Sequence, residues 1–182
     1  PSNLPSARRV AELCFDAYQL RVDPAIAPEL RQNLDELAEY FAGLNTLKTQ
    51  FIEHLVPWRD FERQPNPGHA AMADFLITKS IVASLSSNYD HLIEKCAWDY
   101  GADFRGSLDG DEATACALTQ APLLKLHGCS NRDRNHTVWA LSQLLDPVIA
   151  DRIEKSRIWM AANLRQKDLL VVGFWSDWNY LN

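Results

Sequence analysis

A histidine follows an apolar run at once in the stretch Leu126-His127-Gly128. Residues 121–126 read APLLKL and predict a short buried strand, so the imidazole stands at the carboxyl end of that strand. Histidine suits general-base chemistry because its ordinary pKa is near 6.5. A glycine at position 128 lets the chain turn away and leaves the ring facing a pocket. Taken alone, a histidine at a strand end is more often a structural residue than a catalytic one.

Two further predicted strands, 80–85 and 168–172, also end in polar or glycine residues. In an open parallel sheet, ligands bind beyond the carboxyl ends of the strands, and parallel strands bring those ends to one edge. We therefore expect the three ends to form one site. Ordinary helix capping is the other explanation for Asn-x-Asp at 88–90 and for Asp177. The site residues after strand 80–85 are Ser87, Asn88 and Asp90. Those after strand 168–172 are Gly173, Phe174, Ser176 and Asp177.

The predicted secondary structure that positions this site is helical in the first part of the chain and alternates between strands and helices in the later part. Apolar spacing predicts helices over 4–20, 29–44, 46–55 and 70–78, then a helix from about residue 90 and another over 146–166. The polar stretch 100–120 is expected to be a loop or a small insertion. Strands alternating with helices predict the α/β class, as one domain over residues 1–182. We expect a Rossmann-like parallel sheet with helices on both faces, and a helical insertion near the N-terminus at 24–66.

Composition narrows the class of protein. The 182 residues carry a formal net charge of -6, which gives no bulk attraction to nucleic acid or to an anionic membrane. No apolar run reaches the length of about 18 residues that a membrane span needs, and the N-terminus lacks the apolar core of a signal peptide. The four cysteines form no Cys-x-x-Cys pair, so we expect free thiols, no metal site and a cytoplasmic protein.

Five segments resemble the sirtuin family in the same order along the chain. SSNYDHLIEK is similar to the segment in which Thr/Ser-x-Asn-x-Asp follows a strand, and LLKLHG to the strand that leads to the catalytic His-Gly. KDLLVVGFWSD resembles the later strand ending in Gly-x-Ser, which holds the adenosine side of NAD. PNPGHAAMADF and LPSA resemble the Pro-Asn-x-x-His segment and the loop after the phosphate-binding turn. The spacing is that of the sirtuin-like branch found in prokaryotic defence proteins.

The resemblance implies NAD as substrate and roles for the predicted site residues. His127 would be the catalytic base, and Asn88 would hold the ribose or a water. Asp90 would lie toward the nicotinamide, with Ser87 and Gly128 beside the cofactor. Gly173, Phe174, Ser176 and Asp177 would line the adenosine side. The implied activity is NAD hydrolysis to nicotinamide and ADP-ribose in bacterial anti-phage defence, controlled by other domains or partner proteins and compatible with a homo-oligomer.

Two departures from the family pattern affect this expectation. In the family, a first strand is followed by a Gly-Ala-Gly-x-Ser turn whose backbone N–H groups hold the pyrophosphate. This sequence shows neither, and we expect it to begin just after them. The zinc-ribbon cysteines are also absent, which argues against a protein deacylase. Protein deacylation or ADP-ribosyl transfer therefore stays the weaker enzyme alternative. A module that senses NAD or ADP-ribose without catalysis is the alternative from another class.

Overall fold

The computed structural model of the protein describes residues 4–172, and more than half of these residues lie in helices. A π-helix spans Leu47–Leu55, and short 3-10 helices span Pro28–Gln32, Trp58–Phe61, Arg134–His136 and Leu141–Leu145. The α-helices are α1 (Ala7–Arg21), α2 (Leu34–Gly43), α3 (Pro67–Ile77), α4 (Leu92–Asp99), α5 (Gly110–Cys116) and α6 (Pro147–Asn163). The strands are β1 (Ser84–Ser86) and β2 (Leu123–Lys125).

The predicted Rossmann-like sheet with helices on both faces is wrong for the part of the chain that the structure describes. That part holds a two-stranded parallel sheet, β1 beside β2, in a mostly helical structure. Segment 168–172, the predicted third strand, has no regular secondary structure, and its apolar residues 169–172 are exposed. A strand needs a hydrogen-bonded neighbour for its backbone groups, and no described strand pairs with this segment. An apolar β-type sequence alone does not supply that neighbour.

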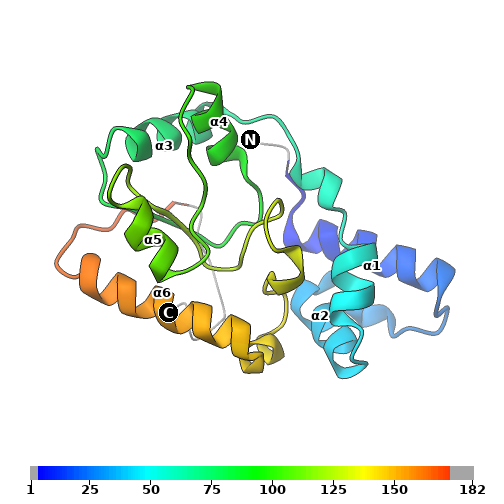
Figure 1. The fold of residues 1–182 in the computed structure, drawn as a ribbon. Coiled ribbons are helices and arrows are strands. Elements are labelled where there is room, and N and C mark those ends of the chain that lie inside the picture. Colours follow the sequence, from blue (N-terminus) through cyan, green and yellow to red (C-terminus); the bar gives the residue numbers. More distant parts are fainter. Residues whose placement is uncertain (1–3, 173–182) are drawn as a thin grey trace.

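The first third of the chain forms a helical body, whose core also includes Trp139 and Ala140 from the segment after β2. Ser6 caps α1, because its hydroxyl accepts a hydrogen bond from the Arg9 N–H at 3.2 Å. The helix predicted over 29–44 is interrupted at Asn33, which instead caps α2. Phe41 and Phe51 are fully buried in this core. Figure 1 shows α1 and α2 together on one side of the molecule, with α3 to α6 on the other.

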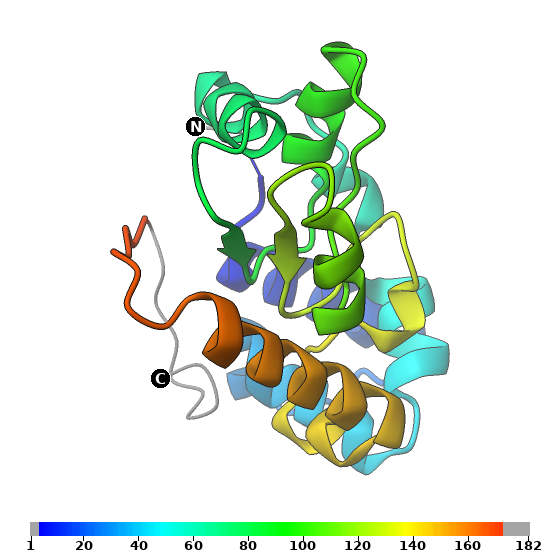
Figure 2. The same ribbon diagram turned by 60° about the vertical axis from the view of Figure 1, so that its left-hand side comes forward.

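The two-stranded sheet lies among the later helices. Leu123 of β2 belongs to a buried cluster with Ala73 of α3 and Ala97 of α4. Leu124, the next residue, is buried with residues of α5 and α6, Ala113 and Trp159. Successive strand residues point to opposite faces, so each face of β2 packs on a different helix pair. Figure 2 shows the two arrows side by side, with α6 passing close to them.

One ion pair links the helical body to α6. Lys48 of the π-helix donates to the Asp146 carboxylate at 2.8 Å, and the same carboxylate caps α6 by accepting from the Val148 N–H at 2.9 Å. The Lys48 ammonium lowers the pKa of Asp146. One side chain therefore both begins α6 and ties it to the part of the chain that precedes the sheet.

We expect Asp146→Ala to lower the free energy of unfolding by about 1–2 kcal/mol. The loss of an N-cap costs about 1 kcal/mol, and a partly exposed ion pair adds about 0.5 kcal/mol. Urea unfolding followed by circular dichroism measures the change. Lys48→Met is the matched control, because it removes the ion pair and leaves the cap, so its loss should be the smaller. Equal losses in the two variants would contradict the capping role.

Candidate functional site

Parallel pairing places the carboxyl ends of β1 and β2 side by side. The Leu126 N–H donates to the Ser86 carbonyl at 2.9 Å just beyond the ladder. One residue further, the backbone of Ser87 hydrogen-bonds the His127 imidazole. The structure therefore brings together two of the three strand ends that the sequence predicts to meet.

His127 is mostly buried at this junction. Burial lowers its pKa to about 4, against the opposing effect of the Ser87 backbone hydrogen bond. The Tyr89 ring lies next to it, with 6.1 Å between the ring centroids. At neutral pH the imidazole is therefore uncharged, which is the form that can accept a proton.

Gly128 makes the turn that the sequence predicts for it. Its φ of +86° lies in the left-handed region that side chains with a Cβ rarely adopt. The space around it is also limited, because a Cβ there would lie 3.1 Å from Cγ2 and 3.2 Å from Cα of Thr137. Glycine at this position lets segment 137–139 run against the end of β2.

Asn88 and Asp90 have different surroundings, although both follow β1. Asn88 is exposed, so its amide is accessible to a ligand. Asp90 is buried, and its carboxylate accepts from the Leu92 N–H at 3.1 Å at the start of α4. Its backbone carbonyl accepts from the Lys125 ammonium. The carboxylate of Asp90 thus bonds the first backbone N–H of α4, whose N-cap residue is His91. The position of Asp90 toward the nicotinamide stays a prediction.

The third predicted strand end cannot be placed beside the other two. Gly173, Phe174, Ser176 and Asp177 lie outside the described residues. Their assignment to the adenosine side of a nucleotide stays a prediction.

Two buried charged residues near the strand ends were not predicted. Lys125 of β2 is 3% exposed and Glu94 of α4 is 2% exposed. Both crowd Gly106, where a Cβ would meet Glu94 Oε1 at 2.6 Å and Lys125 Cγ at 2.8 Å. The sequence did carry a signal for the lysine, because a charged residue between two leucines of a buried strand needs a partner. Lys125 finds that partner in the backbone of Asp90, and so links β2 to the turn before α4.

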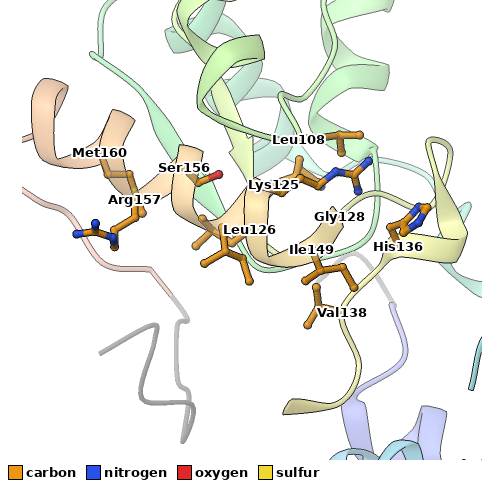
Figure 3. A pocket seen from close by; sticks show the side chains of 12 residues that line it. Leu108, Lys125, Leu126, Gly128, His136, Val138, Ile149, Ser156, Arg157 and Met160 are labelled. Carbon is orange, nitrogen blue, oxygen red and sulfur yellow. The ribbon is translucent and has the colours of Figure 1, made fainter. Parts of the chain in front are cut away.

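A cavity of about 170 Å³ lies between the end of β2 and α6 (Figure 3). Leu126 and Gly128 line it from the strand side, and Ile149 and Ile153 line it from α6. Ser87, Asn88, Asp90 and His127 are not among its lining residues. Its arginines already have partners, since Arg152 bonds Asp133 and Arg157 bonds Glu154. Of the predicted site residues that the structure describes, Gly128 alone lines the cavity, so the cavity borders the site at the strand ends.

The low pKa of His127 predicts a loss of stability between about pH 6.5 and about pH 4. In this window the unfolded chain takes up a proton that the folded protein does not, so the free energy of unfolding falls as the pH falls. The difference of about 2.5 pKa units corresponds to about 3 kcal/mol over the whole window. Urea unfolding at several pH values measures it. His127→Phe, an apolar ring that does not titrate, should show a shallower dependence, and the same slope in both proteins would contradict the assignment.

No family model matches the chain, and no relative was found among the curated proteins. Among residues 4–172, no group of three or more histidine, cysteine, aspartate or glutamate side chains is arranged to hold a metal ion. None of the helices in that range combines the length and the apolar character needed to cross a bilayer. The assignment of a function therefore depends on the residues of the site and on the sequence resemblance.

Proposed function

We propose that this domain hydrolyses NAD to nicotinamide and ADP-ribose. The observation that carries the proposal is the junction of the two strand ends, where an uncharged His127 lies against the backbone of Ser87, with the exposed Asn88 next along the chain. The segments that resemble sirtuins include both ends of this junction. The resemblance also supports the proposed setting, an enzyme of bacterial anti-phage defence.

In the proposed reaction, water attacks the anomeric carbon of the nicotinamide ribose. The bond from this carbon to the pyridinium nitrogen breaks, and its electron pair neutralises the ring, so that nicotinamide leaves uncharged. The proton of the attacking water passes to His127, directly or through a ribose hydroxyl, and is then released to solvent. The products are nicotinamide, ADP-ribose and one proton.

Each residue has a distinct part in this scheme. His127 has the low pKa of a buried imidazole, so it is unprotonated when the reaction begins. The amide of Asn88 offers a donor and an acceptor for the ribose hydroxyls or for the water. Gly128 keeps the chain clear of the imidazole by turning at positive φ. Asp90 contributes by accepting from the first backbone N–H of α4, and this bond holds the turn that carries Asn88.

The test is to incubate the full chain with NAD and to separate the products by chromatography. We expect nicotinamide and ADP-ribose in equal amounts, with no need for an acylated peptide. Formation of an O-acyl sugar only when an acyl-lysine peptide is present would replace the proposal with deacylation. Stoichiometric binding of NAD or ADP-ribose with no product, under conditions that activate the chain in cells, would replace it with a sensing role.

A further inference from the structure

Tyr89 is the residue in which the contacts around the two strand ends converge. It lies between Asn88 and Asp90 in the sequence. Its ring stacks on Trp139 at a centroid distance of 4.1 Å and an interplanar angle of 11°. The same ring faces His127 at 6.1 Å with a tilt of 36°. Trp58 and Phe61 meet it edge-on at 6.5 and 6.1 Å.

The backbone of Val138 ties Tyr89 to His127 a second time. The Tyr89 hydroxyl donates to the Val138 carbonyl at 2.5 Å. The N–H of Val138 donates to the His127 carbonyl at 3.0 Å. A single residue of the segment after β2 therefore connects the hydroxyl of Tyr89 to the main chain of His127, while the two rings face each other directly.

The surface on which Tyr89 stacks is itself held in place. Trp139 is 1% exposed, and its indole N–H donates to the Thr137 hydroxyl at 2.7 Å. Its backbone N–H donates to the Gln143 side chain at 2.7 Å, and Gln143 in turn donates to the Thr137 carbonyl at 2.9 Å. Such a closed set of hydrogen bonds leaves little freedom to the indole. The Tyr89 ring therefore lies between the Trp139 indole, which these hydrogen bonds hold in place, and the titratable ring of His127.

We infer that Tyr89 is a positioning residue that sets the orientation of the His127 ring through the His127–Tyr89–Val138 contacts. Its effect on turnover depends on the proposed function, whereas its effect on the imidazole does not. In this assignment Tyr89 does not touch the substrate. It covers one side of the imidazole and fixes the end of β2 from which the imidazole extends.

Nuclear magnetic resonance titration of the His127 ring in the ¹⁵N-labelled full chain tests the inference without reference to activity. The signal is assigned by its loss in His127→Gln. Wild type should titrate at about pH 4. In Tyr89→Leu the pKa of His127 should rise by about one unit or more, because a ring that loses cover regains hydration of its charged form. Tyr89→Phe keeps the ring but not the bond to Val138, and should shift the pKa in the same direction by less.

Phe61→Leu is the matched control for a general loosening of the aromatic cluster. Phe61 is buried and meets the rings of Tyr89 and Trp58, so it belongs to the same aromatic cluster. We expect this variant to lose stability without moving the His127 titration. A shift as large as that of Tyr89→Leu would overturn the inference. The inference would also be overturned if the His127 titration were unchanged in every Tyr89 variant that folds. If Tyr89→Leu does not fold, Tyr89→Phe alone decides.

The activity measurement separates this inference from the proposed function. Tyr89→Leu should lower kcat for nicotinamide release by about tenfold or more, because small misplacements of a reacting group are costly. KM should change little, since Tyr89 is not placed against the substrate. If no form of the chain releases nicotinamide, the proposed function fails, and the titration still decides whether Tyr89 positions the ring.

Discussion

Replacing His127 by alanine is expected to lower nicotinamide release by about 10²- to 10⁴-fold, the usual contribution of a general base. The reason is the state of the ring, which burial keeps uncharged and which the backbone of Ser87 and the ring of Tyr89 hold at the junction of the strand ends. A group that acts in the transition state lowers kcat and kcat/KM together when it is removed. Initial rates over a range of NAD concentrations measure both.

Three comparisons sharpen this experiment. Asn88→Ala should also lose activity, and because Asn88 is exposed its fold should be intact. His54→Ala removes an exposed histidine of the π-helix and should turn over NAD as wild type does. Added imidazole should restore part of the rate in His127→Ala and none in Asn88→Ala. Undiminished turnover in both His127→Ala and Asn88→Ala would refute the site.

The elements with clear local signals could be predicted from the sequence. The helix predicted over 4–20 is α1, and the long helix predicted over 146–166 is α6 with Asp146 as its cap. The strand predicted at 121–126 is present in shorter form at 123–125. The strand predicted at 80–85 lies at 84–86, so it overlaps the prediction at two residues and includes Ser86. The 3-10 helix Trp58–Phe61 packs inward, with Trp58 and Phe61 in the core.

One local prediction was incomplete and another was wrong. The sequence predicts a loop or a small insertion at 100–120, and this stretch contains α5, where Asp109 accepts from the Glu112 N–H and Glu112 accepts from the Leu108 N–H. The Asp-x-x-Glu spacing of a capped helix was present in the sequence and was outweighed by the polar composition. Segment 168–172 has the composition of a strand. Strand formation depends on a paired neighbour elsewhere in the fold, which composition does not reveal.

In the candidate site, too, contacts that follow from strand pairing could be predicted, and contacts between residues far apart in the chain could not. The sequence predicts that His127 and the turn containing Asn88 meet, because both follow strands of one parallel pair. It gives no sign that Trp139 stacks on Tyr89, since the two residues are far apart in the chain and no motif links them. The Asn-x-Asp pattern gives no role to Tyr89, which lies between Asn88 and Asp90. Its contacts became evident only from the packing.

Gly110→Ala is expected to lower the free energy of unfolding by about 3 kcal/mol, at the upper end of the usual cost of overpacking. Gly110 is the first residue of α5, and a Cβ there would lie 2.2 Å from the Lys155 carbonyl oxygen and 2.8 Å from Trp159 Cβ. These atoms belong to the backbone and the first side-chain carbon of α6, so no flexible side-chain end can move aside. Relief requires that the two helices separate.

Separation of α5 from α6 would also disturb β2, because Ala113 of α5 and Trp159 of α6 enclose Leu124 in one buried cluster. Gly43→Ala is the matched control: Gly43 ends α2, and a Cβ there would meet nothing within 4 Å. Alanine has the higher helix propensity, so this variant should keep or gain up to about 1 kcal/mol. Urea unfolding of the two variants beside wild type measures the contrast. A loss in Gly110→Ala no larger than the change in Gly43→Ala would mean that α5 and α6 do not approach each other as closely as described, and that the end of β2 carrying His127 is held by other contacts.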